Sequence, residues 1–259
     1  MEVIAHRGRI SPHEFGNSLN NFISAYNIGV NGIETDISLT ADKKIIIYHP
    51  GSTRPYLTKM NWNDINSSIF KVMNFSEFLN LLKSLPNISC CLDIKQNRRE
   101  LVIKAVETVL DEGLQNRIYL TAFEKRARWL TIESDVKLLM LAREIDPSVK
   151  IQLITTTSWN LIKLADKYHP NAMSIGWLLE PLPIRLVTKS LFKIKSKTLN
   201  FKRQIKELKS RGIKIWAGIF NNPEDMKYFI DLGIDGIMTD SPKTVFELIE
   251  KKKSPNGIF

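Results

Sequence analysis

Two histidines and two acidic residues in the first fifth of the chain have the side chains needed for phosphoester chemistry. His6 and His49 each follow a short apolar run, and Glu34 and Asp36 lie two residues apart in another. Imidazoles can supply a base and an acid near neutral pH. Side chains two apart on a strand share a face, where two carboxylates can hold a divalent cation. The set suits metal-assisted hydrolysis of a phosphodiester.

The placement of these residues favours one site over scattered surface positions. The chain has four histidines, and an isolated histidine is most often a surface or satisfied core residue. Ligands of parallel α/β folds, however, gather outside the carboxyl ends of the strands. Because His6, His49 and the acidic pair are all expected at strand ends, we interpret them together.

Strand-like apolar runs alternate with helical periodicity along most of the chain. The expected strands cover residues 3–5, 32–37, 44–48, 88–94, 118–123, 149–154, 172–176, 213–219 and 236–239. Amphipathic helices are expected over residues 17–28, 75–85, 101–110, 223–232 and 242–249. Several strands are continuously apolar, as in a buried parallel sheet. Roughly eight strand–helix units predict an α/β fold, the TIM (β/α)8 barrel.

The 259 residues fit one domain, 1–259, because the composition is ordinary and no linker-like tract occurs. The strand before His49 is an additional one, and the inserted segment 50–74 that follows shows little periodicity. We expect this segment to form a short excursion over the catalytic mouth of the barrel. Its larger side chains could contact substrate or serve loop packing; they include Arg54, Tyr56 and Trp62.

The sequence also predicts a cytoplasmic protein without a transmembrane segment. No apolar run approaches the roughly 20 residues needed to span a bilayer, and the N-terminus enters a strand-like run without the pattern of a signal peptide. Cys90 and Cys91 are adjacent in a strand-like run, so they should point to opposite faces and form no ordinary disulfide with each other.

A net charge of +10 would attract anionic partners of any kind. Much of the excess lies between Arg185 and Arg211. We interpret this basic segment as a solvated helix face and connecting loop, with peripheral contact to phospholipid headgroups as the functional alternative. Nucleic-acid binding is not expected, because no helix-turn-helix, zinc or RNA-binding sheet motif accompanies the charge.

Several motifs, in order from residue 4 to about residue 249, resemble the glycerophosphodiester phosphodiesterase family. They are His6-Arg7-Gly8, Asn17-Ser18-Leu19, Gly32-Ile33-Glu34-Thr35-Asp36, His49, Asp93-Ile94-Lys95, Trp216, Asn221 and the closing Thr239-Asp240-Ser241-Pro242. The resemblance implies a TIM barrel that uses Mg²⁺ or Ca²⁺. It also implies a small-molecule substrate, a glycerophosphodiester that is hydrolysed to glycerol 3-phosphate and an alcohol.

By motif position, the resemblance implies a role for each residue of the expected site. His6 and His49 would be the catalytic acid and base, in an order that the sequence leaves open. The remaining roles would be metal binding by Glu34, Asp36 and Asp93, phosphate binding by Arg7 and Lys95, and lining of a substrate pocket by Trp216.

Three of these residues also have structural alternatives. Trp216 could fill the barrel instead of lining its mouth. Asp93 and Lys95 could form a structural ion pair, which has the same spacing as a metal site. Asp240, at the end of the last expected strand, is interpreted as a residue that caps or braces the final turn and not as a catalytic one.

The chain departs from the family pattern at several positions. Phe15-Gly16-Asn17-Ser18 stands where the family commonly has Pro-Glu-Asn-Thr, so one glutamate is missing unless Glu14 replaces it. Pro50 follows His49 in place of an aspartate, and Asp93 stands where the family has a glutamate. The shorter side chain moves its carboxylate by about 1.5 Å, which bears on metal choice and affinity.

The leading hypothesis is therefore a metal-dependent phosphodiesterase acting on glycerophosphodiesters. A lysophospholipase D-like activity is the nearest alternative, because an open mouth would admit a larger leaving group. A second class is a barrel that binds phosphate or another anion with weakened catalysis. The carboxylates argue against that class, since simple anion binding needs none of them.

Overall fold

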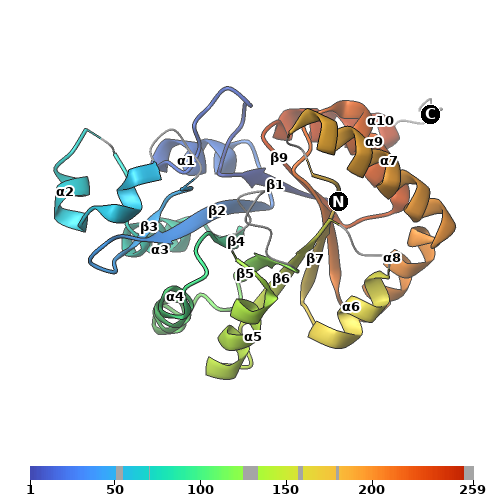
Figure 1. Ribbon diagram of the computed structural model, residues 1–259. Helices are drawn as coiled ribbons and strands as arrows, with labels where there is room; N and C mark the ends of the chain where they lie inside the picture. Colours follow the sequence, from blue (N-terminus) through green and yellow to red (C-terminus); the bar gives the residue numbers. More distant parts are fainter. Residues whose placement is uncertain (51–54, 70, 125–133, 157–159, 179–180, 254–259) are drawn as a thin grey trace.

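The computed structural model describes residues 1–50, 55–69, 71–124, 134–156, 160–178 and 181–253, and these build a parallel β-barrel surrounded by helices (Figure 1). The strands are β1 (Glu2–His6), β2 (Gly32–Leu39), β3 (Ile45–Ile47), β4 (Ser89–Ile94), β5 (Ile118–Phe123), β6 (Lys150–Thr155), β7 (Ala172–Ile175), β8 (Lys214–Ala217) and β9 (Gly236–Thr239). The order around the sheet is β1, β9, β8, β7, β6, β5, β4 and β2, and pairing of β1 with β2 closes the ring.

Helices on the outside of the barrel connect the parallel strands, as Figure 1 shows. They are α1 (Leu19–Asn27), α2 (Trp62–Asn66), α3 (Phe75–Ser84), α4 (Arg99–Asp111), α5 (Val136–Ile145), α6 (Leu161–Tyr168), α7 (Leu182–Thr198), α8 (Phe201–Ser210), α9 (Pro223–Leu232) and α10 (Pro242–Lys253), with a 3-10 helix η1 (Pro55–Lys59). The predicted TIM (β/α)8 barrel is thus confirmed. Within the described residues, no helix combines the length and apolar character that a bilayer crossing requires.

Side-chain alternation divides most of the strands between two apolar regions. The larger region lies between the barrel and its helices and includes Cys90, whereas Cys91 belongs to a small cluster with Ile4 and Trp216. Both thiols are buried and free. The expectation that the adjacent cysteines point to opposite faces and form no disulfide is confirmed. Burying most of the apolar surface on the outer face leaves the interior face available for polar groups.

The extra strand β3 pairs antiparallel with the second half of β2, beyond the part of β2 that pairs with β1. The segment that follows β3 carries η1 and α2, which lie to one side of the barrel in Figure 1. Leu57 and Ile65 are buried with Tyr48, and Trp62 packs against them. Loop packing therefore explains Trp62, while Tyr56 is 43% exposed. Arg54 lies outside the described residues.

A tight turn directly after β1 holds the start of the expected site. Arg7 and Gly8 both adopt positive φ, and Gly8 N–H donates to the Ala5 carbonyl. A Cβ on Gly8 would lie 2.5 Å from a ring carbon of Phe22, which is fully buried on α1. Only glycine combines this backbone conformation with so close an approach of the helix.

We predict that Gly8→Ala destabilises the fold more than Gly29→Ala does. Both positions have positive φ, but nothing lies within 4 Å of a Cβ on Gly29. Strain alone should cost about 1–2 kcal/mol at each position, and overpacking against Phe22 should add about 1–3 kcal/mol at Gly8. Chemical denaturation of the two variants measures this difference. Equal losses of unfolding free energy would contradict the proposed close packing.

Candidate active site

The register of the parallel strands brings together residues that are far apart in sequence. His6 of β1 pairs with Glu34 of β2, and Asp36 pairs with Asp93 of β4. His6 ends β1 and Asp93 lies near the carboxyl end of β4, whereas Glu34 and Asp36 lie within the longer strand β2. Because the register aligns Glu34 with His6 and Asp36 with Asp93, the four side chains meet at the same end of the barrel. Thr121 of β5 is the next partner of Asp93 in the ring.

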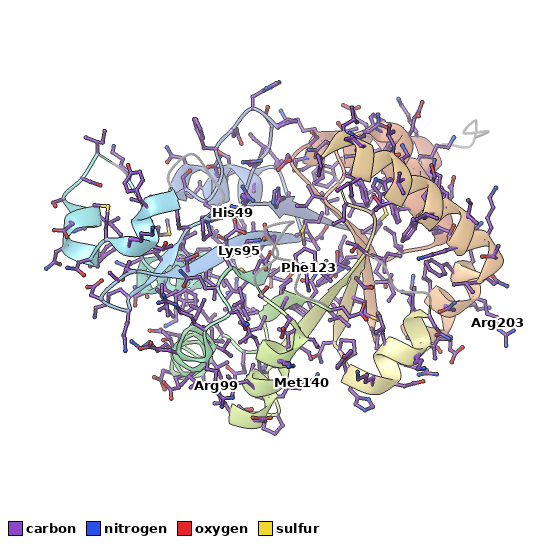
Figure 2. The ribbon with its side chains drawn as sticks, viewed as in Figure 1. His49, Lys95, Arg99, Phe123, Met140 and Arg203 are labelled. Atoms are coloured by element: carbon purple, nitrogen blue, oxygen red, sulfur yellow. The ribbon has the colours of Figure 1, made fainter. Side chains whose placement is uncertain are left out.

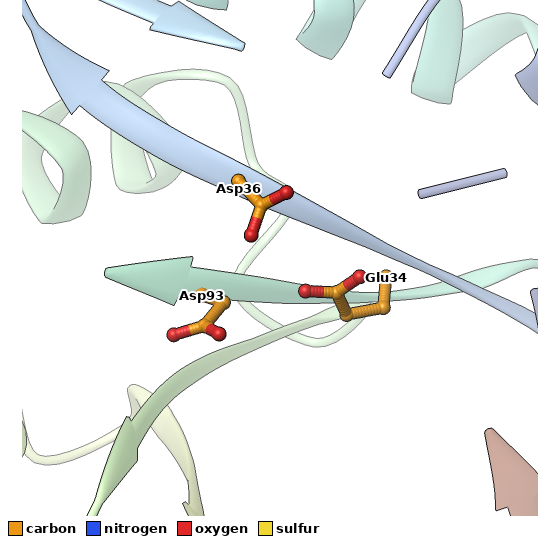
Figure 3. Close-up of side chains that lie close together, drawn as sticks. All are labelled: Glu34, Asp36 and Asp93. Atoms are coloured by element: carbon orange, nitrogen blue, oxygen red, sulfur yellow. The ribbon is translucent and has the colours of Figure 1, made fainter. Parts of the chain in front are cut away.

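Three buried carboxylates form the centre of the site, as Figure 3 shows. Glu34, Asp36 and Asp93 each offer one oxygen atom, and these oxygens all lie within 4.8 Å of one another. Burial, and then repulsion by Asp36, raises the pKa of Glu34 well above its ordinary value. Burial likewise raises the pKa of Asp93, against the opposing effect of Lys95. Negative charge is therefore under-compensated here.

Two cationic side chains offset part of this charge. Lys95 Nζ lies 3.0 Å from an Asp36 oxygen and also pairs with Asp93, while Arg7 Nε lies 2.9 Å from the other Asp36 oxygen. Although burial alone would raise it, these two cations hold the pKa of Asp36 well below its usual range. The pKa of Lys95 is raised because the three carboxylates outweigh its own burial.

The carboxylate cluster fits a divalent cation. Three carboxylates against Lys95 and Arg7 leave one net negative charge when all are ionised, and a divalent ion would reverse it. Asp93 Oδ1 is buried and has no hydrogen-bond partner in the structure, so one donor atom is available. Carboxylate oxygens are the ligands that Mg²⁺ and Ca²⁺ prefer. The residues present therefore match the metal that the motifs implied.

His6 is held in place by Asp240. Its Nδ1 atom lies 2.7 Å from Asp240 Oδ1, and its Nε2 atom lies 3.7 Å from Glu34 Oε2. Burial lowers the pKa of His6, and the hydrogen bond to Asp240 opposes that effect. Although burial of Asp240 disfavours its ionisation, His6 and Asn221 lower the pKa of that carboxyl to about 2. An ionised Asp240 accepts the Nδ1–H and directs Nε2 toward the carboxylates.

His49 enters the same pocket from the segment after β3. Figure 2 shows His49, Lys95 and Phe123 toward the middle of the molecule, and all three line the pocket that also contains His6. Burial, followed by the charges of Lys95 and Arg7, lowers the pKa of His49 to about 3 in spite of the opposing field of Asp36. Burial therefore lowers the pKa of both imidazoles below the ordinary histidine value in the free chain.

The pocket has a volume of about 560 Å³ and two kinds of wall. The charged wall carries the histidines, the carboxylates, Arg7 and Lys95, except that Asp36 is wholly buried behind it. The apolar wall includes Phe123, Ile154, Trp177, Leu178, Ile219 and Met238. A ligand with one anionic end and one less polar end suits this division.

Several residues of the site were missed or interpreted differently from the sequence. Asp240, expected only to brace the final turn, also binds His6 and Arg9, whose Nη1 lies 3.2 Å away. Asn221 Nδ2 donates to the other Asp240 oxygen at 2.7 Å. Asp240 follows β9, whose pairing with β1 places it beside His6. The sequence signal for a role of Asp240 in the site was its position at the carboxyl end of an expected strand.

Gly16 stands at the position of the missing glutamate, and Glu14 does not take its place. Asn17 stands beside the cluster, where its Nδ2 donates to Asp36 at 2.8 Å and its Oδ1 accepts from Thr35. Glu14 instead accepts hydrogen bonds from Ile10 N and Asn21 Nδ2. The carboxylate of Glu14 therefore organises the loop after β1 and does not substitute for a metal ligand.

Trp216 requires a correction. Its side chain is fully buried, and its Nε1 donates to Glu2 Oε2 at 2.8 Å. Its ring packs edge-on against Tyr119, with the centroids 5.1 Å apart. Glu2 begins β1, at the opposite end of the barrel from His6. Trp216 fills the barrel interior and does not line the substrate pocket, whereas Trp177 does.

Comparison with known proteins identifies a family that has these features. The model of the glycerophosphoryl diester phosphodiesterase family matches residues 6–244. A glycerophosphodiester phosphodiesterase of Caldanaerobacter subterraneus is 22% identical, with 96% of this chain and 98% of the relative covered. Human lysophospholipase D GDPD1 is 24% identical over 92% of this chain and 83% of the relative.

Solved structures support the same fold. The crystal structure of a glycerophosphodiester phosphodiesterase from Parabacteroides distasonis has a TM-score of 0.73 at 18% identity, covering 98% of both chains. A phosphodiesterase of Oleispira antarctica, solved in complex with the product sn-glycerol-3-phosphate, has a TM-score of 0.71 at 15% identity, covering 96% of this chain and 97% of that one.

We predict that Mg²⁺ or Ca²⁺ raises the melting temperature of the metal-free chain by several degrees, and that Asp93→Asn largely abolishes this response. An ion at 100 times its Kd stabilises the folded state by about 2.7 kcal/mol. Asp225→Asn is the matched control, because Asp225 is a buried carboxylate that pairs with Lys189 outside the site. Thermal scans in EDTA and in each cation measure the shift. A full response in Asp93→Asn would contradict the assignment.

Proposed function

Because the chain belongs to the glycerophosphoryl diester phosphodiesterase family, and is thus a phosphodiester hydrolase, we propose that it hydrolyses glycerophosphodiesters to glycerol 3-phosphate and an alcohol with a bound divalent cation. The observation that carries the proposal is the convergence of His6 and His49 on one pocket with the carboxylate cluster. The Oleispira relative that binds sn-glycerol-3-phosphate supports this product.

The charges of the pocket suit a phosphodiester monoanion. Glu34, Asp36 and Asp93 would hold the cation, which supplies positive charge to the nonbridging phosphate oxygens. Arg7 and Lys95, each already oriented by Asp36, add fixed positive charge on the same side. Because the charged side chains around the cation site are largely buried, such preorganised charges act strongly on the developing negative charge.

The two histidines transfer the protons. One takes a proton from the attacking oxygen, and the other gives a proton to the leaving alkoxide, which otherwise departs poorly near pH 7. The hydrogen bond from His6 to Asp240 suits either role. The carboxylate stabilises protonated His6, which forms when His6 acts as a base and is the starting state when His6 acts as an acid. Arg9 and Asn221 in turn hold Asp240.

We predict that His6→Asn and His49→Asn each reduce kcat for glycerophosphocholine by at least about 100-fold, the usual contribution of a general acid or base. His169→Asn is the matched control, because His169 has positive φ at the end of α6 and asparagine tolerates that conformation. Release of glycerol 3-phosphate, assayed with EDTA, Mg²⁺ and Ca²⁺, measures the effect. Metal-dependent release that survives either substitution would contradict the assigned roles.

Asp240→Asn tests the positioning role of this carboxylate. We expect kcat to fall by roughly 100-fold or more with a much smaller change in KM, because an amide stabilises the wrong imidazole tautomer without altering the phosphate-binding charges. Nitrogen NMR of the His6 ring should show the changed tautomer directly. A residue that merely braced the final turn would lower the melting temperature and leave the tautomer and kcat unchanged.

A lysophospholipase D-like activity is the second candidate. It is favoured by the apolar wall of the pocket, where Phe123, Trp177 and Leu178 could accept an acyl chain, and by similarity to human lysophospholipase D GDPD1. Hydrolysis of a lysophospholipid would give lysophosphatidic acid and the headgroup alcohol. The phosphate would occupy the same charged wall in both reactions.

We predict that Trp177→Ala separates the two substrates. Removing the ring should reduce kcat/KM for lysophosphatidylcholine roughly tenfold relative to glycerophosphocholine, because only the lysophospholipid carries an acyl chain. Choline release measures both substrates in one assay. Because Trp177 also packs against buried Phe220 and Phe229, a Trp177→Phe variant controls for lost packing. An equal loss on both substrates would remove the second candidate.

A further inference from the structure

Helix α7 turns an apolar face outward instead of inward. Five large apolar side chains on this helix are 47–61% exposed: Leu182, Leu186, Val187, Leu191 and Ile194. Surface helices normally place charged and polar residues on the face opposite the core. Figure 1 shows α7 on the outside of the barrel, beside α9 and continuing toward α8.

The opposite face of α7 is anchored to the barrel. Phe192 and Ser196 are its buried residues, and the Phe192 ring packs against Trp177 at a centroid distance of 5.6 Å. Lys189 Nζ lies 2.6 Å from Asp225 on α9. At 100° per residue, Val187, Leu191 and Ile194 lie within about 60° of one another, across the helix from Phe192. Leu182 and Leu186 lie at the edge of this face, on the side of Lys189. The apolar face is therefore not a docking surface for another part of the described chain.

The positive charge of α7 favours an anionic partner. Five basic residues and no acidic residue occur in α7. Arg185 and Lys189 pair with Asp225, and Lys193 Nζ lies 5.1 Å from the centre of the Tyr228 ring on α9. Lys195 and Lys197 border the apolar face on either side near the end of the helix. The adjoining α8 adds exposed basic residues; these are Lys202, Arg203 and Lys206, and Figure 2 shows Arg203 pointing away from the barrel.

We propose that the outward face of α7 binds the surface of membranes that contain anionic phospholipids. Apolar side chains flanked by lysines on one helix match the boundary between acyl chains and negatively charged headgroups. A second copy of the chain fits less well, because a two-fold contact would place the same lysines opposite each other. This surface is distinct from the catalytic pocket and needs no catalytic residue.

The position of α7 would place the mouth of the catalytic pocket near a bound membrane. The helix begins shortly after Trp177 and Leu178, which line the pocket at the carboxyl end of β7. Docking through α7 would bring that side of the mouth close to lipid, where amphiphilic phosphodiesters reside. This consequence rests on the proposed function, whereas membrane binding itself does not.

Sedimentation with sucrose-loaded vesicles tests the proposal on the full chain. Vesicles of phosphatidylcholine alone are compared with vesicles that contain about 30% phosphatidylglycerol, in roughly 0.1 M and 0.5 M salt. We expect the parent chain to bind the anionic vesicles at low salt and to be released at high salt. Leu186→Gln/Val187→Gln should weaken binding about tenfold, and Lys195→Gln/Lys197→Gln roughly ten- to thirtyfold.

Leu19→Gln/Ile23→Gln is the matched control, because these two residues are 47% and 37% exposed on α1. It should bind as the parent does. Failure of the parent to bind anionic vesicles, or parent-like binding by both α7 variants, would overturn the proposal. So would a dimer in light scattering that Leu186→Gln/Val187→Gln dissociates, because the face would then join two copies. Hydrolysis of soluble glycerophosphocholine should be unchanged in every variant, and its absence in the parent would count against the proposed function alone.

Discussion

Three carboxylates buried within 4.8 Å of one another repel strongly, and the arrangement around them is organised by that repulsion. Asp36 stays ionised because Arg7 and Lys95 both pair with it. Glu34 and Asp93 receive less compensation, which is why burial raises their pKa values. A buried ionised group needs a partner, and a divalent cation would bring the positive charge that the described residues around the cluster do not supply.

Barrel closure brings the members of this cluster together from separate parts of the chain. The parallel register aligns His6 with Glu34 and Asp36 with Asp93, so the acidic centre is built from rigid strands. Pairing of β9 with β1 then delivers Asp240 to the far side of His6. The acidic cluster and the His6–Asp240 pair are thus parts of one network in which Glu34 Oε2 lies 3.7 Å from His6 Nε2.

Much of the fold and the acidic half of the site could be predicted because their signals are local. Apolar runs around His6, Glu34 and Asp93 mark strands, and parallel strands of a barrel bring their side chains to a common end. The role of Asp240 could not be inferred in this way, because it depends on a contact between residues 234 positions apart. For Trp216, alternation indicates which face of the strand it occupies, but its depth along the barrel depends on the register of the neighbouring strands. The outward apolar face of α7 could not be predicted from the sequence. Phe192 lies among several apolar residues, and only tertiary packing determines which of them points toward the barrel.

We infer that Glu34, Asp36 and Asp93 form one cation site next to the phosphate-binding side chains. Anomalous diffraction from crystals soaked with Mn²⁺ and glycerol 3-phosphate tests this inference most directly. We expect one strong Mn²⁺ peak at about 2.0–2.4 Å from oxygens of all three carboxylates, with the phosphate against Arg7 and Lys95. Absence of a peak at this cluster, or phosphate bound at a different place on the barrel, would contradict the assigned site.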